Sequence, residues 1–167
     1  MIIEGLKRFA QMLALLVVQV FLMNHIHFFG YGTPLVYVAL LLYMPSSWGR
    51  IASLAWGFVM GFLVDMFSNT PGMSAGSMTL AAMIQPVLLN VFRPKDALED
   101  MTPNYHTMGV WNHLRYLTLI LLIHHAAFFM LQSFSFYNLT DLGLSAGISF
   151  AISWLVIVVM EIMRGHE

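Results

Sequence analysis

Six apolar runs, separated by short polar or charged stretches, limit what this chain can fold into. Four of them have about the 20 residues that a helix needs to cross the ~30 Å hydrocarbon layer of a membrane. Charged residues make up 9% of the chain, whereas a soluble domain carries about 25%. We therefore expect one all-α transmembrane domain over residues 1–167, with six transmembrane helices. The runs cover residues 9–29, 34–44, 51–66, 73–92, 114–136 and 143–163.

The second run, residues 34–44, is too short to cross a bilayer as a straight helix. It covers only ~16 Å at ~1.5 Å per residue, so it crosses if it is tilted, extended through Trp48 or set in locally thinned membrane. Pro34 suits the first turn of a helix with Thr33 as its cap, and Pro45 would end or kink that helix.

The basic residues decide whether the second run crosses. In a six-span arrangement all seven Lys and Arg residues lie on one side of the membrane, and the opposite loops hold none. If the second run did not cross, Lys7 and Arg8 would face away from the other five. Because cytoplasmic loops are enriched in Lys and Arg, we expect six spans, cytoplasmic termini and an outward-facing turn at residues 68–72. The seven residues are Lys7, Arg8, Arg50, Arg93, Lys95, Arg115 and Arg164.

The most specific motif is a polar turn between the third and fourth apolar runs. Ser53 begins a stripe of small residues spaced four apart, which ends in an acid and lies on one helix face. Five turn formers follow, and a GxxxG pair flanks the turn on each side, as is typical of close helix contacts in membranes. The candidate structural or partner-binding residues are Gly57, Gly61, Asp65, Ser68, Asn69, Thr70, Pro71, Gly72 and Gly76.

Asp65 is the one acid well inside an apolar run. It lies ~21 Å along the helix that starts at Ile51, and hence in the outer leaflet, where a charge costs less than at the midplane. We expect it to accept hydrogen bonds from backbone N–H groups of the turn and of the next helix, with Thr70 as cap and Pro71 at the first helical position. The alternative is a charge contact with a basic residue of a partner.

Catalytic motifs are missing from the sequence. It has no HExxH, GxSxG or Walker loop and no clustered pair of acids, so we expect no enzymatic activity. A net charge of -1 argues against a nucleic-acid surface, and the lack of Cys excludes a thiolate metal site. The loop over residues 93–112 reads either as a solvated connector or as a docking surface.

Polar residues inside the apolar runs are the remaining candidates. His124 and His125 are adjacent, so on a helix they point about 100° apart and cannot bind one ion from the same face. Gln85 precedes Pro86, which predicts a kink, either packed against other helices or lining a ligand pocket. We expect hydrogen-bonded intramembrane residues here, with no metal and no cofactor. Small residues also form two stripes in the last run, Gly143, Gly147 and Ala151, and Ser145, Ser149 and Ser153, for contacts within the chain or with a second protein.

Three segments resemble the bacterial rod shape-determining membrane protein family MreD. They are NHIHFFGYGTP at residues 24–34, GFLVDMFSNTPGMSA at residues 61–75 and LLNVFRPKDALED at residues 88–100. The pair His124 and His125, with FFMLQSFSF after it, is similar to the fifth span in some branches of that family. The resemblance covers most of the chain, and its most specific part is the acid followed by SNTPG and Met.

The resemblance implies a non-catalytic scaffold of the cell-wall elongation machinery that determines cell shape from the bacterial inner membrane. The implied partners are MreC and, through it, MreB and the glycosyltransferase and transpeptidase that build peptidoglycan. The family is also similar in fold to the substrate-binding components of energy-coupling-factor vitamin transporters. That similarity supplies the alternative, a membrane subunit that binds a vitamin-like molecule or a lipid, with a cavity lined by polar groups such as Gln85, Asn90 and His124.

Overall fold

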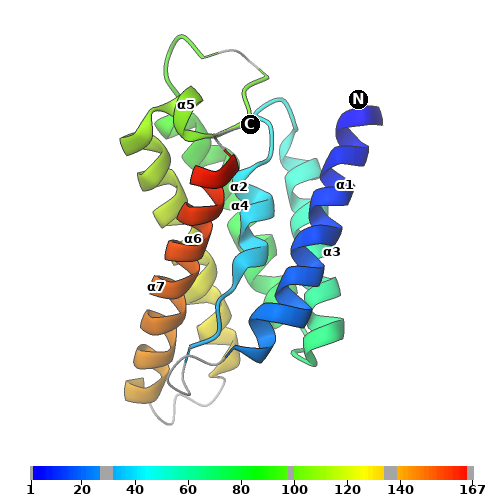
Figure 1. Cartoon of the computed structure of the whole chain (residues 1–167), viewed down its shortest axis with the longest axis vertical. Coiled ribbons are helices and arrows are strands. Elements are labelled where there is room, and N and C mark those ends of the chain that lie inside the picture. Colours follow the sequence, from blue (N-terminus) through cyan, green and yellow to red (C-terminus); the bar gives the residue numbers. More distant parts are fainter. Residues whose placement is uncertain (1, 27–31, 98–99, 134–138, 165–167) are drawn as a thin grey trace.

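Helices account for most of the computed structural model, which describes residues 2–26, 32–97, 100–133 and 139–164. Figure 1 shows the long helices side by side, with both ends of the chain at the same end of the bundle. We call this the terminal end, and we call the opposite end, where α3 passes into α4, the hairpin end. The expected all-α class is confirmed for the described residues.

Among the described residues, five stretches of helix are long and apolar enough to cross a membrane, which indicates a multi-pass membrane protein. They are Gly5–His25, Arg50–Ser68, Met73–Phe92, Val110–Gln132 and Thr140–Arg164. The first combines α1 (Ile2–Val17), the π-helical turn η1 (Val18–Leu22) and the 3-10 turn η2 (Met23–His25). The others are α3 (Arg50–Ser68), α4 (Met73–Phe92), α6 (Val110–Gln132) and α7 (Leu139–Arg164).

The segment that contains the second apolar run passes through the middle of the bundle. Figure 1 shows residues 32–44 rising from the hairpin end to the terminal end between the long helices. Only η3 (Val36–Val38) and α2 (Ala39–Leu42) are helical there. Every side chain from Leu35 to Met44 is at most 5% exposed. We call residues 32–44 the core segment.

The expected helix that starts at Pro34 with a Thr33 cap is wrong. The first helical residue of the core segment is Val36, and no side chain caps it. The backbone N–H groups of Thr33 and Leu35 donate to side chains of α7. Because partners outside the segment already bind these groups, the backbone can stay extended at this depth without leaving them unpaired.

The hairpin of α3 and α4 is closely packed because two glycines of α3 face the backbone of α4. A Cβ atom on Gly61 would lie 2.4 Å from the carbonyl oxygen of Ser74, and one on Gly57 would lie 2.9 Å from the Cβ of Ala82. This is the close approach that the first GxxxG pair predicts. The second GxxxG pair makes no such backbone contact. Gly72 adopts a left-handed backbone with φ 84°, and Gly76 faces only a side chain of α6.

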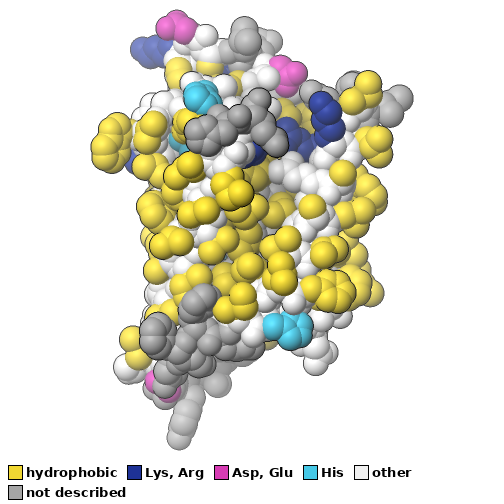
Figure 2. Space-filling model, viewed as in Figure 1, with side chains coloured by type: hydrophobic (Ala, Val, Ile, Leu, Met, Phe, Trp, Pro, Cys, Tyr) yellow, Lys and Arg dark blue, Asp and Glu magenta, His cyan; other side chains and the backbone are white. Residues whose placement is uncertain are grey.

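The surface shown in Figure 2 is a hydrophobic band with charged groups beyond it. Lys and Arg side chains of this face gather at the terminal end, where Arg50 begins α3 and Arg164 ends α7. The short helix α5 (Tyr105–Met108) belongs to the loop over residues 93–112. This loop contacts the residues that follow the core segment, because the Ser46 N–H donates to the Met101 carbonyl and Asp100 accepts from Ser47.

Candidate functional site

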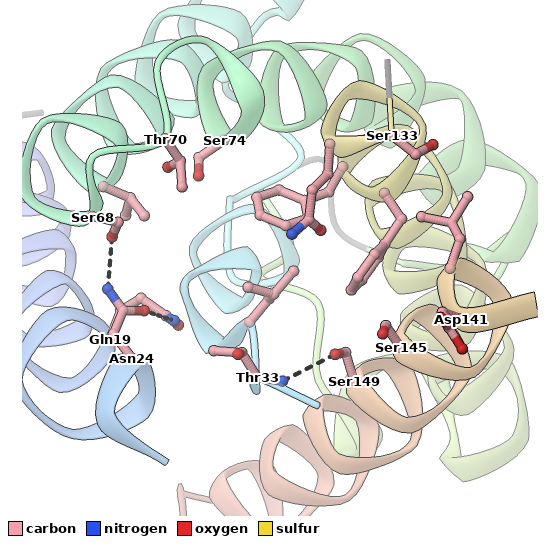
Figure 3. Close-up of a pocket in the computed structure, with 16 residues that line it drawn as sticks. Gln19, Asn24, Thr33, Ser68, Thr70, Ser74, Ser133, Asp141, Ser145 and Ser149 are labelled. Carbon is pink, nitrogen blue, oxygen red and sulfur yellow. Dashed lines mark hydrogen bonds between the residues drawn. The ribbon is translucent and has the colours of Figure 1, made fainter. Parts of the chain in front are cut away.

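A polar cavity of about 560 Å³ lies at the hairpin end of the bundle. Figure 3 shows how its side chains converge from η1, the start of the core segment, the α3–α4 turn and the ends of α6 and α7. Most of the lining side chains are uncharged hydroxyls and amides, and Asp141 contributes a carboxylate at its exposed rim. Such a lining offers hydrogen-bond donors and acceptors to a polar ligand.

Asp65 holds together the α3–α4 turn, whose residues Thr70 and Ser74 line this cavity. Its Oδ1 accepts from the Thr70 hydroxyl at 2.8 Å and from the Ser74 N–H at 2.8 Å, and its Oδ2 accepts from the Ala75 N–H at 2.9 Å. The two backbone N–H groups of α4 are donors that the sequence predicts, whereas the bond from the Thr70 hydroxyl is not. Ser74 and Ala75 are the second and third residues of α4, so the carboxylate occupies the place of an N-cap side chain.

The position of the cap itself differs from the sequence prediction. α4 begins at Met73 after Gly72, and the Thr70 hydroxyl donates to Asp65 instead of capping the helix. Asn69 ends α3 with a left-handed φ of 54°, which Asn tolerates better than most residues. The reason for the shift is that a carboxylate five residues before Thr70 already satisfies the first N–H groups of α4.

Gln19 connects the cavity to the core segment. It is fully buried in the π-helical turn η1, and its amide donates to the Pro34 carbonyl at 3.0 Å and accepts from the Val36 N–H at 2.8 Å. The amide also donates to Asn24 at 2.9 Å, and Asn24 donates to the Ser68 hydroxyl at 2.6 Å. One chain of hydrogen bonds therefore joins η1 and η2 to the core segment and to the end of α3. Figure 3 shows the links from Gln19 to Asn24 and from Asn24 to Ser68.

Two serines of α7 hold the other side of the core segment. Ser149 accepts from the Thr33 N–H at 3.1 Å, and Ser153 accepts from the Leu35 N–H at 2.8 Å. The Ser153 hydroxyl also lies 3.1 Å from Nε2 of His125. This side of the last run therefore makes contacts within the chain, whereas Gly143 and Gly147 have no atom near the place of a Cβ.

The predicted intramembrane residues are placed apart from the cavity. His124 and His125 point to different helices, since Nε2 of His124 lies 3.1 Å from the Ser77 hydroxyl of α4. Gln85 donates to the Tyr116 hydroxyl at 3.0 Å. Gln85 and Asn90 line a smaller cavity of about 200 Å³ at the terminal end, and His124 lines none of the three cavities described here. The expected pocket is therefore found only in part, since Gln85 and Asn90 share a cavity that His124 does not line.

Glu161 is buried, although its place near the end of the last run predicts a side chain that reaches the interface. It is 4% exposed, and its Oε1 lies 3.4 Å from Nε2 of His113, which is 2% exposed. Both side chains line a third, apolar cavity of about 350 Å³ between α6 and α7. No group of three or more His, Asp or Glu residues within the described ranges is arranged to hold a metal ion.

Sequence reasoning missed Gln19, Asn24 and the pair of His113 and Glu161. Gln19 interrupts an otherwise apolar run, and a polar side chain at membrane depth is a signal of function or of a buried partner. His113 and Glu161 gave a weaker signal, because each lies near the end of a run, where a polar side chain can also reach water.

Comparison of the chain with protein-family models, with curated proteins and with solved structures finds no match. The class of protein therefore follows from its own features, which are those of a multi-pass α-helical membrane protein with a polar cavity at one end.

Proposed function

We propose that this chain is a non-catalytic scaffold of the bacterial cell-wall elongation machinery, related to the MreD family and acting with MreC. The observation that carries the proposal is the turn closed by Asp65. The most specific part of the resemblance, the acid followed by SNTPG and Met, is the part whose backbone is fixed by three hydrogen bonds to one carboxylate. A fixed turn with exposed Asn69 and Pro71 suits recognition by a partner.

The proposed topology has six crossings in the inner membrane, with both termini in the cytoplasm. The core segment would be the second of these crossings, and its path between the two ends of the bundle supports that place (Figure 1). An extended backbone is tolerated at membrane depth only when protein surrounds it, and the core segment is buried along its whole apolar length. The gathering of Lys and Arg at the terminal end favours the cytoplasmic side for that end.

The test separates the surface of the turn from its internal support. Asn69→Gly keeps the left-handed backbone without the side chain, and Pro71→Ala removes an exposed ring. We expect the combined variant to be as stable as the parent but to lose copurification with MreC and the elongation enzymes, and to give rounded cells. Asp96→Ala, an exposed change in the loop at the terminal end, is the control. Retained binding and rod shape in the turn variant would reject this role for the turn.

The second candidate is a membrane subunit that binds a small molecule, and the polar cavity favours it. A cavity of about 560 Å³ is large enough for a vitamin-sized ligand. Its hydroxyl and amide groups suit a polar ligand with little net charge. The candidate would work with an energising module, as a transporter subunit.

The second candidate is tested by filling the cavity. Mass spectrometry of the detergent-extracted protein should detect a copurifying small molecule. Ser145→Phe places a ring in the cavity from its wall and should abolish this copurification. Leu144→Phe, at an exposed neighbour on α7, should not. Uptake of a vitamin by cells with this chain and an energising module would support the second candidate over the scaffold.

A further inference from the structure

The apolar cavity between α6 and α7 contains an acid that its own surroundings do not fully satisfy. Glu161 Oε2 has no hydrogen-bond partner among the described residues, and neither has Nδ1 of His113. The two side chains approach each other only at 3.4 Å through Glu161 Oε1, which is long for a charge-assisted hydrogen bond. A buried carboxylate oxygen without a donor costs free energy, so the site favours a ligand that brings one.

Apart from Tyr105, the rest of the cavity wall is made of aliphatic side chains. Its wall includes Val110, Leu114, Leu117, Val158 and Ile162, and its volume is about 350 Å³. A polar or charged group would lose its hydration against such a wall without gaining a partner, whereas the acyl chain of a lipid fills it without that cost. The ligand should therefore combine a hydrogen-bond-donating cation with a hydrocarbon chain.

The positions of Glu161 and Arg164 indicate where the positive and negative groups of the ligand would lie. Glu161 and Arg164 are three residues apart on α7, so their side chains share a helix face with Cβ atoms ~5–6 Å apart. The Arg164 guanidinium lies over the ring of Tyr43, 4.2 Å from its centroid, one turn nearer the terminal end. A cation beside Glu161 and an anion beside Arg164 match a zwitterionic headgroup with adjacent ammonium and phosphate.

We propose that this cavity binds the headgroup and upper acyl chain of a phosphatidylethanolamine molecule from the leaflet at the terminal end. The primary ammonium donates to Glu161 Oε2, the phosphate pairs with Arg164, and the chain lies against the apolar wall. His113 faces Glu161 from α6, with its Nε2 3.4 Å from Glu161 Oε1. The proposal goes beyond the scaffold function and holds for either direction of insertion, since it depends only on the end of the bundle where Glu161 lies.

The experiment compares lipids that differ only at the headgroup nitrogen. The protein is placed in nanodiscs of phosphatidylglycerol with either phosphatidylethanolamine or phosphatidylcholine of the same acyl chains, then extracted and examined by native mass spectrometry. The three methyl groups of choline remove every N–H donor. We expect about tenfold more retained phosphatidylethanolamine than phosphatidylcholine, the factor that one charge-assisted hydrogen bond supplies.

Variants assign the preference to the cavity. Glu161→Gln should reduce the preference to near one, while Asp96→Asn, which removes an exposed acid at the same end, should keep it. Val158→Phe narrows the cavity from its apolar side and leaves the carboxylate in place, so it should also abolish retention. This variant keeps the test decisive if Glu161→Gln does not fold.

Three results would overturn the proposal. The first is equal retention of the two lipids by the parent protein, which is also the result expected if a basic side chain of a partner helix occupies the cavity. The second is a preference that survives in folded Glu161→Gln or Val158→Phe. The third is a rise in melting temperature with phosphoethanolamine alone that equals the rise with the lipid, because it would mean that the acyl chain plays no part.

Discussion

Asp65 performs at a distance the task that an N-cap residue performs locally. The carboxylate comes from α3 and accepts from two N–H groups in the first turn of α4. Its burial, at 6% exposed, and the positive end of the helix make those bonds stronger than they would be in water. One side chain therefore sets both the end of α3 and the start of α4.

Replacing Asp65 should destabilise the protein in a graded way. Asp65→Asn keeps one oxygen but presents an N–H group to one of the donors, so it should cost about 1–3 kcal/mol. Asp65→Leu leaves both backbone donors and the Thr70 hydroxyl unpaired and should cost more than Asp65→Asn. Thermal unfolding of the isolated protein in detergent measures the order. If both variants match the parent in stability but lose partner binding, the charge acts on the partner instead.

Gln19 should be at least as sensitive, because its amide serves two backbone groups of the core segment. Gln19→Leu has nearly the same size but leaves these groups unpaired, so we expect a loss of about 2–4 kcal/mol. Gln11→Leu is the matched control, since Gln11 only accepts from Arg8 on the same helix. It should shift stability by less than about 0.5 kcal/mol. Equal melting temperatures for the two variants would contradict the assigned role of Gln19.

At the scale of elements, the contact of α3 with α4 depends on the lack of a side chain at Gly61. Gly61→Leu would force atoms into the backbone of α4 and should destabilise the protein by about 3 kcal/mol or more. Val59→Leu, at a side chain that is 43% exposed, should be nearly silent. Thermal unfolding in detergent compares the two. A tolerated Gly61→Leu would mean that the helices are separated in the membrane.

The sequence predicts the positions of the long helices well because each of them coincides with a long apolar run. It also predicts the close face at Gly57 and Gly61, since the spacing of small residues is a local pattern. It fails at the core segment. A short apolar run has the same hydropathy as a short helix, and its extended start depends on Gln19 and Ser153, which lie far away in the chain. Such partners leave no signal within residues 34–44 themselves.

The candidate site shows the same limit. The donors to Asp65 could be predicted because they lie within ten residues of it. The cavity could not, because its walls come from η1, the core segment and four long helices, and no one of these segments has a polar run of its own. The polar residues that sequence reasoning did select, Gln85 and His124, instead bind other helices in the core.

At the scale of the whole molecule, the proposed six-span topology gives a direct prediction. A reporter fused after Thr70 should behave as extracytoplasmic and one fused after Thr102 as cytoplasmic, because these residues lie at the hairpin end and in the loop at the terminal end. The physical reason is the excess of Lys and Arg at the terminal end. Cytoplasmic behaviour at both sites would reject the topology.

The enclosed path of the core segment also constrains the order in which the protein can be assembled. The Thr33 and Leu35 N–H groups bind serines that lie 116 and 118 residues further along the chain. During synthesis these groups wait, without their final partners, until almost the whole polypeptide has left the ribosome. A nascent chain arrested before α7 should therefore leave the core segment outside the hydrocarbon layer. The core segment should enter the membrane only when α7 has been synthesised.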